Sequence, residues 1–566
     1  MSTLAARPTR TRHAKFREQS LAVAHQRLMI LMLLFSAVAI VIALRLLWLT
    51  VFADGALGRP NPNLLAPPRA DIVDRNGEVL ARTIDAWSVG VHANRLLNKP
   101  EDLAPKLAAL MPERTEVQYL ALLKSGAHFT YLRRRAMPEL VAAVNALGEP
   151  GMAFSREPER LYPQLTLAAH VLGYTDMDGH GVTGMERVLD TRLRDPALRK
   201  TPVTLSIDTR VQAAMESELN SAMVAHQALG ATGLVMDVRT GEMLALVSLP
   251  VFNPNKIGQS NPEAIRNNVT QSVYELGSTF KPITMAGAID AGVVTSLSKR
   301  YDATVPLQVG KYKIKDDHPM NRWLNVPETL VHSSNIVTAR IADQMGAPRM
   351  EALFRRVGFY EPPYIELKEK GRPLVPGYWG RTTTMTTAYG HGIAVTPLQL
   401  ASAYAALVNG GTWRPATLMK VQPGRAAKGR RVFSQHASDT IRQLLRLVVT
   451  DGTGKKADVA GMRVGGKTGT AEKPGIGGYS KHVNVSTFAA AFPMDAPRYV
   501  VIAMLDSPKG NAESFGLTTA AWTAAPVVAK VIARTGPMLG VFPDPSREMP
   551  LDELRTLIWK AKDGEE

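Results

Sequence analysis

The longest apolar stretch of the chain lies close to its N-terminus. Residues 28–44 form a run of 17 residues without a charge, and after Arg45 the apolar character continues through residues 46–52. A stretch of this length that is apolar on every face predicts a membrane-spanning helix over residues 28–52. Arg45 and Trp48 would lie near one membrane surface, where a long cationic stem and an indole ring are both favourable.

Two other interpretations of this stretch are a buried helix of a soluble domain and a cleaved signal peptide. The uniform apolarity argues against the buried helix. The stretch also exceeds the roughly 7–15 apolar residues of a signal peptide, and no A-x-A cleavage site follows it. Residues 1–27 hold six Arg or Lys side chains and one acid, Glu18. The positive-inside rule therefore predicts a cytoplasmic tail over residues 1–27 and an external chain after Phe52.

Residues 53–200 carry a mixed pattern without candidate chemistry. Residues 53–68 contain four prolines and predict an extended linker. Alternating apolar positions flank Asn76-Gly77, a dipeptide typical of tight turns, and predict a β-hairpin. Apolar positions at helical spacing predict helices in residues 100–111 and 138–147.

From residue 201 onward the pattern changes, with strands predicted at both ends of a long region and helices between them. In chain order these patterns occupy residues 201–219 (strand and helix), 231–250 (two strands), 335–346 and 396–411 (helices), and 462–472, 485–492 and 498–505 (strands). This order predicts an α+β domain over residues 201–535, with one antiparallel sheet closed by strands from both ends. Residues 536–566 predict a loose C-terminal tail with one short helix.

Composition narrows the function classes. The chain has 566 residues, which is more than one ordinary domain, and its 45% hydrophobic and 21% charged residues are typical of folded proteins. It has no cysteine, which excludes disulfides, thiolate nucleophiles, iron–sulfur clusters and Cys-ligated zinc. The net charge of +17 favours an anionic neighbour. Because the chain lacks zinc-finger spacing and basic runs interleaved with aromatic residues, we expect no nucleic-acid partner.

Ser278 and Lys281 form the first candidate for chemistry. The chain has no G-x-S-x-G or H-E-x-x-H motif, and its 12 histidines lack ligand spacing, so we expect no metal site. A helix beginning at Ser278 would place the Lys281 amine on the same face as the Ser278 hydroxyl. A serine nucleophile needs an adjacent base, and lysine can serve only if burial or another cation lowers its pKa. Gly277 allows a close backbone approach, and Pro282 is tolerated in a first helical turn.

The Ser-x-x-Lys spacing alone is not specific, because it recurs in a turn-like stretch at residues 296–299. Two further groups follow Ser278 in the chain. Ser333-Ser334-Asn335 can supply a second hydroxyl for proton relay and an amide that orients a peptide substrate. Lys467-Thr468-Gly469-Thr470 lies on a predicted strand. A strand edge can pair with an extended peptide, and a lysine beside threonine hydroxyls suits a terminal carboxylate.

S-x-x-K, S-x-N and K-T-G in this order are the signature of penicillin-binding proteins and serine β-lactamases. Around these motifs the chain resembles class B penicillin-binding proteins in more detail, and the resemblance covers nearly the whole chain. The segments that carry it are residues 69–77 (RADIVDRNG), 160–163 (RLYP), 184–186 (GME), 274–282 (YELGSTFKP), 396–401 (TPLQLA) and 466–472 (GKTGTAE). Two departures are Ala70 and Leu276, where that family usually has glycine and proline, and neither carries a reactive group.

The resemblance implies an α+β fold in two external parts. An elongated, mixed, non-catalytic pedestal domain of the dimerisation type would precede a transpeptidase domain whose antiparallel sheet has helices on both sides. It further implies a peptidoglycan D,D-transpeptidase, without cofactor or metal, that cross-links stem peptides through an acyl-enzyme on Ser278. Lys281 would be the base, and Ser333 would pass a proton to the leaving amine.

The same resemblance implies the substrate contacts. The residues that would hold the donor peptide and its carboxylate are Asn335, Lys467, Thr468, Gly469 and Thr470. The backbone N–H groups of Ser278 and Thr470 would form an oxyanion hole. Charge repulsion from Lys467 would help to keep Lys281 neutral.

Several alternatives stay open. A β-lactamase needs fast deacylation, but Glu366 and Glu369, which follow the Ser-x-Asn group, lie outside any E-x-x-L-N pattern. A D,D-carboxypeptidase, an elongation-specific class B transpeptidase and a non-catalytic envelope scaffold are the others. The short basic tail, the single anchor, the modest pedestal and the lack of C-terminal repeats favour the division-specific, FtsI-type member.

For the FtsI type the resemblance also implies a location and partners. The chain would be anchored in the cytoplasmic (inner) membrane, with its catalytic domain outside at the division septum. β-Lactams would be covalent inhibitors. The expected partners are peptidoglycan stem peptides, a membrane-embedded glycosyltransferase of the FtsW kind and other divisome proteins.

Overall fold

A computed structural model describes residues 26–44, 68–475 and 478–559, and the chain divides into two compact units, Met1–Ala66 and Pro67–Glu566. In the first unit, Gln26–Leu44 forms a helix of 19 residues with a mean hydropathy of 2.6, long and apolar enough to cross a membrane. The helix is exposed along its whole length. The predicted continuation over residues 45–52 and the predicted linker up to residue 67 lie outside the described residues.

The second unit opens with a five-stranded sheet in the order β3-β2-β1-β5, with β4 paired to β2. Its strands are β1 (Ile72–Val73), β2 (Val79–Val91), β3 (Thr130–Ala136), β4 (Met152–Leu161) and β5 (Val203–Thr204). The predicted hairpin is confirmed, since β1 pairs antiparallel with β2. Asp74 closes the turn by accepting hydrogen bonds from the backbone N–H groups of Asn76 and Glu78, and Gly77 has a φ of +95° that a glycine tolerates.

Three helices pack on this sheet and close a small core. They are α3 (Pro100–Leu110), α4 (Glu116–Leu123) and α5 (Pro138–Asn145), and α3 and α5 lie in the two ranges that the sequence predicted as helical. The apolar residues at their helical spacing face the strands, with Leu103, Leu107 and Tyr119 buried against Val89 and Val91. An apolar stripe on each helix therefore explains why this part of the chain folds around its own core.

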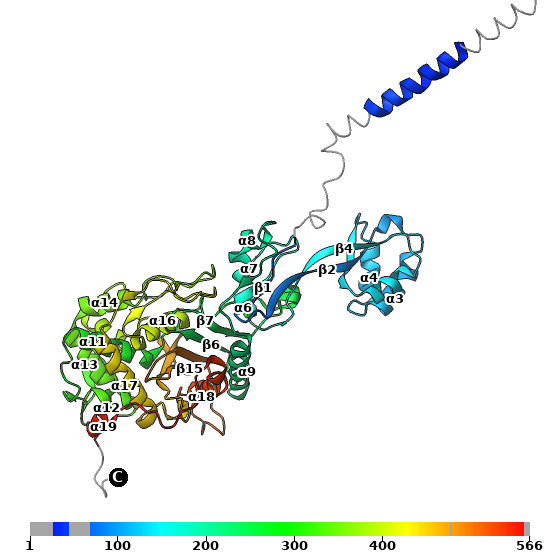
Figure 1. Ribbon diagram of the computed structural model, residues 1–566. Helices are drawn as coiled ribbons and strands as arrows, with labels where there is room; N and C mark the ends of the chain where they lie inside the picture. Colours follow the sequence, from blue (N-terminus) through cyan, green and yellow to red (C-terminus); the bar gives the residue numbers. More distant parts are fainter. Residues whose placement is uncertain (1–25, 45–67, 476–477, 560–566) are drawn as a thin grey trace, which may run out of the picture. The chain divides into compact units, whose positions relative to one another are not determined.

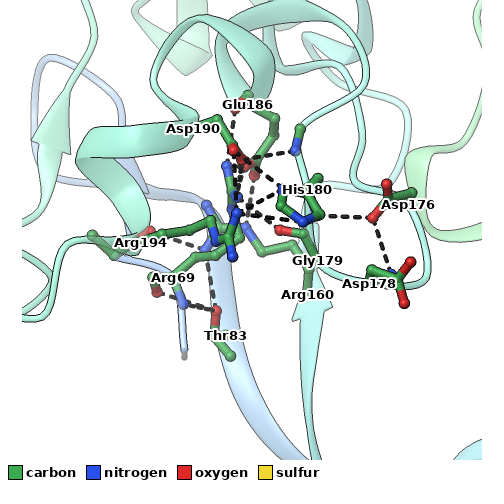
Figure 2. Close-up of polar contacts among 12 residues, drawn as sticks. Arg69, Thr83, Arg160, Asp176, Asp178, Gly179, His180, Glu186, Asp190 and Arg194 are labelled. Carbon is green, nitrogen blue, oxygen red and sulfur yellow. Dashed lines mark hydrogen bonds and ion pairs between the residues drawn. The ribbon is translucent and has the colours of Figure 1, made fainter. Parts of the chain in front are cut away.

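Two arginines share one buried carboxylate near the start of this sheet (Figure 2). Glu186, on the short helix α7 (Gly184–Val188), is fully buried. Arg69 Nε donates to Glu186 Oε2 at 2.9 Å, and Arg160 Nε donates to Glu186 Oε1 at 2.7 Å. The motif residues that resemble those of the pedestal domain thus converge on one ion network that ties three distant segments together.

The central sheet of the remaining chain has the order β14-β15-β16-β6-β7, and every neighbouring pair is antiparallel. The strands are β6 (Gly230–Asp237), β7 (Met243–Leu249), β14 (Gly465–Gly475), β15 (Gly478–Phe492) and β16 (Tyr499–Asp506). β16 pairs with β6 from Tyr499↔Asp237 to Asp506↔Gly230. The sheet is therefore closed by strands from both ends of the domain, as predicted (Figure 1).

Helices cover both faces of this sheet. Successive strand residues point to opposite faces, so Val235 and Val501 pack against α9 (Thr209–Ala225) and α18 (Ala524–Thr535). Leu234 and Ile502 belong to the other core. That core is built by α11 (Lys281–Asp290), α12 (Val326–Val331), α13 (Asn335–Met345), α14 (Ala347–Arg356), α16 (Pro397–Val408) and α17 (Gln435–Asp451).

The prediction of a loose C-terminal tail is wrong for residues 536–559. Met549, Leu551 and Leu554 are buried in the main core. Glu548 accepts from Arg446 Nε at 3.0 Å, and the backbone N–H of Trp559 donates to the carboxylate of a residue in α12. The predicted short helix is present as α19 (Asp552–Thr556). A few apolar side chains without periodicity anchor the segment, so the sequence pattern gave no sign of its packing.

We expect Glu186→Ala to destabilise the protein strongly, because it leaves two buried guanidinium groups without their shared carboxylate. Removing one partner of a buried ion pair costs about 3–5 kcal/mol. The measurement is thermal unfolding of the full chain in detergent. The matched control is Asp71→Ala, which breaks the exposed pair between Arg82 and Asp71 at 2.9 Å and should cost at most about 1 kcal/mol. Equal shifts for both variants would contradict this account.

Candidate active site

Ser278 lies on a 3₁₀ turn rather than at the start of an α-helix. The turn η4 spans Gly277–Phe280, and α11 begins at Lys281. The reason is Pro282, which has no N–H to give the Ser278 carbonyl its α-helical hydrogen bond. The backbone N–H of Lys281 bonds to that carbonyl instead. Residues three apart lie on one side of a 3₁₀ turn, so the expectation that Ser278 and Lys281 share a face holds although the predicted helix start is three residues too early.

The hydroxyl of Ser333 links the candidate nucleophile to two lysines. Ser333 Oγ donates to Ser278 Oγ at 3.0 Å. Lys281 Nζ and Lys467 Nζ each donate to Ser333 Oγ at 3.0 Å. A hydroxyl has one proton and two lone pairs, so these three contacts use its full capacity. The sequence analysis expected Ser278 and Lys281 to meet directly, whereas the structure connects them through Ser333.

Ser333 is held by the short loop between α12 and α13. Its φ is +58°, an uncommon value for a residue with a side chain, so the surrounding loop must fix it. Ser334 caps α13 by accepting from a backbone N–H and donates its own proton to Asp316 Oδ2 at 2.7 Å. The N–H of Ile336 donates to Asp316 Oδ1 at 2.9 Å. Asp316 therefore fastens the loop, and nothing in the sequence pattern indicated that role.

Asn335 lies at the first position of α13, and its amide Nδ2 donates to the Lys315 carbonyl at 3.0 Å. The side chain is half-buried. The amide is thus oriented by a backbone group of the neighbouring β10 segment, next to the loop that holds Ser333.

Lys467 and Thr468 lie on β14, the strand at one end of the central sheet. Lys467 is fully buried, and its amine also donates to Thr468 Oγ1 at 3.1 Å. Thr468 Oγ1 lies 3.1 Å from Thr453 Oγ1, a hydroxyl that the motif analysis missed because it stands in no recognisable pattern. Thr470 Oγ1 accepts from the Ala520 N–H at 3.1 Å. Among the described strands β14 has one partner, β15, so its outer edge faces the nucleophile turn.

Glycines bring β14 and the nucleophile turn into contact. A Cβ atom on Gly469 would lie 2.3 Å from the Leu276 carbonyl oxygen and 2.7 Å from a methyl group of Thr279. Gly277, with a φ of +54°, approaches Thr470 in the same way, and a Cβ there would lie 2.8 Å from the Thr470 oxygen. The close approach expected of Gly277 is thus present, and its cause is the neighbouring strand.

A third glycine completes this packing. Gly390 has a φ of +82°, and a Cβ on it would lie 2.3 Å from the Gly277 carbonyl oxygen. The following residues form part of the same wall, since the Gly392 N–H donates to Glu275 Oε1 at 3.0 Å. The sequence analysis did not single out these residues; a Tyr-Gly-His-Gly run at 389–392 was the available signal.

Burial lowers the pKa of both lysines. Lys281 is fully buried, and desolvation of its ammonium lowers the pKa to about 7, while Asp316 and Asp317 oppose the shift. Desolvation also lowers the pKa of Lys467 well below its usual range, and the charge on Lys281 lowers it further. A substantial fraction of Lys281 is therefore a neutral amine near neutral pH. The sequence analysis relied on charge repulsion, but burial is the larger cause.

His391 lies near these groups and was also missed. Burial lowers the pKa of its imidazole, the charge on Lys281 contributes in the same direction, and Glu275 opposes both. His391 is therefore mostly neutral at pH 7. Its ring packs against Tyr389 with centroids 5.2 Å apart.

The other candidates from the sequence lie elsewhere. Glu366 accepts from the Leu418 N–H at 2.9 Å, and Glu369 pairs with Arg187 at 3.3 Å, so both carboxylates are engaged away from Ser278. The second Ser-x-x-Lys match is exposed, and Ser296 Oγ lies 2.8 Å from Ser298 Oγ. Across residues 26–44, 68–475 and 478–559, no group of three or more His, Asp or Glu side chains could hold a metal ion.

Comparisons with known proteins agree with this geometry. Residues 231–531 match the family described as "Penicillin binding protein transpeptidase domain", and residues 64–196 match the "Penicillin-binding Protein dimerisation domain". The chain is 40% identical over 504 residues to the "Probable peptidoglycan D,D-transpeptidase FtsI" of Caulobacter vibrioides, covering 87% of this chain and 85% of that protein. It is 30% identical over 441 residues to "Peptidoglycan D,D-transpeptidase FtsI" of Escherichia coli, covering 74% and 73%.

A solved structure is similar as well. The crystal structure of penicillin binding protein 3 from Mycobacterium tuberculosis, complexed with aztreonam, matches with a TM-score of 0.67 and 26% sequence identity. The match covers 85% of this chain and 98% of that one.

We expect the rate at which penicillin acylates Ser278 to rise about tenfold from pH 6 to pH 8 and then to level off. With a pKa of about 7, Lys281 is about one-tenth neutral at pH 6 and about nine-tenths neutral at pH 8, and only the neutral amine can take a proton. The measurement is the second-order acylation rate of the full chain in detergent across this range.

The same profile for His391→Asn separates the two titrating groups. If the midpoint near pH 7 persists in that variant, it belongs to Lys281. If the midpoint disappears, or if the wild-type rate keeps rising to pH 10, the assignment to Lys281 is wrong.

We expect Gly469→Ala to slow acylation by about a hundredfold or more, because the added methyl group pushes β14 away from the nucleophile turn, and misplacement by about 1 Å has effects of that size. The control is Gly377→Ala, where a Cβ would meet nothing within 4 Å. The control should retain its acylation rate within about twofold, and an equally fast Gly469→Ala protein would show that the close approach is dispensable.

Proposed function

The chain belongs to the class B penicillin-binding proteins, the FtsI-type peptidoglycan D,D-transpeptidases, and from this membership we propose how its residues carry out the reaction. The enzyme cross-links peptidoglycan stem peptides in cell division, through a serine acyl-enzyme that β-lactams mimic. The observation that carries the residue assignment is the Ser333 hydroxyl, which joins Ser278, Lys281 and Lys467 by three hydrogen bonds.

In the acylation step, Ser278 Oγ attacks the carbonyl between the two terminal D-alanines. The proton of Ser278 passes to Ser333, whose own proton passes to the neutral amine of Lys281. The resulting ammonium of Lys281 returns a proton, again through Ser333, to the nitrogen of the departing D-alanine. The C–N bond breaks, free D-alanine leaves, and the donor peptide is held as an ester on Ser278. The depressed pKa of Lys281 supports this role, since an ordinary lysine is almost fully charged at pH 7.

The donor peptide lies along the outer edge of β14. Its terminal carboxylate is bound by Lys467, Thr468 and Thr453, whose amine and hydroxyls form one hydrogen-bonded group. Asn335 holds the donor from the opposite side. A free strand edge supports this arrangement because it offers backbone groups to an extended peptide.

The oxyanion formed during the attack is stabilised by the backbone N–H groups of Ser278 and Thr470. Each such donor is typically worth about 3–4 kcal/mol of transition-state stabilisation. The contact of Gly277 and Gly469 across the turn and the strand supports this proposal, because it holds the two N–H groups on adjoining elements.

In the second step the side-chain amine of a neighbouring stem peptide attacks the ester. Transfer to an amine rather than to water is favoured here because a hydrolase needs a carboxylate that activates water. Glu366 and Glu369 are bound to other parts of the fold. Water as the acceptor would make the enzyme a D,D-carboxypeptidase, which is the second candidate reaction.

The apolar helix Gln26–Leu44 serves as a single-pass membrane anchor. We propose that it lies in the cytoplasmic membrane with the basic N-terminal tail inside and the catalytic domain outside, as the flanking charges predict. The chain matches no glycan-polymerising domain, so we propose a membrane-embedded glycosyltransferase of the FtsW kind and other divisome proteins as its partners.

A fluorescent penicillin tests the nucleophile. We expect one slowly released adduct on the wild-type chain by intact mass, and no adduct on Ser278→Ala. Ser296→Ala is the matched control, since it removes the serine of the exposed Ser-x-x-Lys match and should react like wild type. Rapid turnover of the penicillin would point to a β-lactamase, and a wild-type chain without any adduct would point to a non-catalytic scaffold.

A further inference from the structure

A polar cleft of about 650 Å³ opens at the end of the central sheet where β16 finishes and β6 begins. The residues of its lining that matter here are Thr232, Arg266, Asn268, Gln271, Tyr274 and Asp506. A second cavity of about 340 Å³ lies beside it and is lined by Glu275, Glu472 and Lys473 among others. Tyr274 lines both cavities, and the ion pair of Lys473 with Asp506 at 2.8 Å joins their walls. The two cavities therefore adjoin.

The cavities continue the path of the proposed donor peptide. Its carboxylate is placed at Lys467 and Thr468, so its upstream residues follow β14 toward Glu472 and Lys473, at about 3.3 Å per residue. That end of β14 opens into the smaller cavity. A stem peptide that leaves the strand there passes Tyr274 and reaches the larger cleft with the residues nearest to its sugar.

A row of cross-strand neighbours connects the catalytic strand to this cleft. Gly469 pairs with Thr487, Thr487 with Met504, Met504 with Thr232, and Thr232 with Ser248. Residues that lie directly opposite one another point to the same face of a sheet. The row therefore lies on the face that carries the nucleophile turn, which Gly469 contacts.

One hydroxyl of this row is available to a ligand. Thr232 is only 1% exposed, and its Oγ1 has no hydrogen-bond partner among the described residues, although it lines the cleft. A buried hydroxyl without a partner is costly, and a hydroxyl or amide of a bound molecule would satisfy it. The Thr487 hydroxyl is also buried without a partner among those residues, but it does not line the cleft.

We propose that this cleft binds the N-acetylated sugar to which the donor stem peptide is attached. The inference rests on the proposed transpeptidase function. Amide side chains, a hydroxyl and an aromatic ring suit a neutral ligand rich in hydroxyl and acetamido groups. Asp506 is already paired with Lys473, and Arg266 donates to the Ser272 hydroxyl at 2.9 Å, so the cleft presents no concentrated charge for a free carboxylate. The volume lies within the usual range of about 300–1,000 Å³ for small-ligand sites.

The test compares two donors on the full chain in detergent. One is a bare pentapeptide that ends in D-Ala-D-Ala, and the other is the same pentapeptide carried on an N-acetylglucosamine–N-acetylmuramic acid disaccharide. The readout is kcat/KM for release of D-alanine. We expect wild type to prefer the disaccharide-linked donor by about tenfold or more. Thr232→Val, which keeps the volume and removes the hydroxyl, should reduce that preference by about three- to tenfold, and Arg266→Ala should reduce it as well.

Thr487→Val is the matched control, because it removes a buried hydroxyl of the same row outside the cleft and should leave the preference unchanged. Acylation by penicillin and turnover of the bare peptide should stay at wild-type levels in all three variants. The inference is overturned if wild type has no preference, if the cleft variants keep it, or if they slow the bare peptide equally. Failure of wild type to form a penicillin adduct would instead refute the proposed function.

Discussion

The structure depends on the burial of two lysine amines around one serine hydroxyl. An ammonium group loses its hydration when it is fully buried, so Lys281 and Lys467 have lowered pKa values. Ser333 offers the one oxygen that both amines reach. Its remaining capacity, a single proton, is directed at Ser278. A base, a relay and a nucleophile therefore follow from one packing arrangement.

The rest of the domain keeps that arrangement in place. Asp316 fastens the loop that holds Ser333 in a positive-φ conformation. Glycines at 277, 390 and 469 let the nucleophile turn, the neighbouring loop and β14 approach more closely than any residue with a Cβ atom would allow. The antiparallel sheet supplies the rigid edge against which the turn is set. Precise placement of reacting groups has a large effect on rate, and here it is achieved mainly by backbone packing.

Motifs outside the active site serve the architecture. Arg69, Arg160 and Glu186 form a buried ion network in the segment before the catalytic domain. Glu369 pairs with Arg187 beside that network, and its backbone carbonyl accepts from Thr270 at 2.7 Å. Thr270 belongs to the segment that leads to Ser278. Contacts of this kind join the two parts of the second unit through ordinary packing and hydrogen bonds.

The amino-acid sequence by itself determined the local elements and the chemistry of the motifs. Apolar spacing predicted the helices and the strands of the central sheet, Asn76-Gly77 predicted the hairpin turn, and the three motifs identified Ser278, Lys281 and Lys467. Each of these depends on neighbours within a few residues or on a motif already known. Only the tertiary structure decided that Ser333 connects Ser278 with the lysines, because it lies 52 residues from Lys281 and 134 from Lys467. The same holds for Thr453, Asp316, Gly390 and the packed C-terminal segment, whose partners are distant in the chain and leave no periodic signal in it.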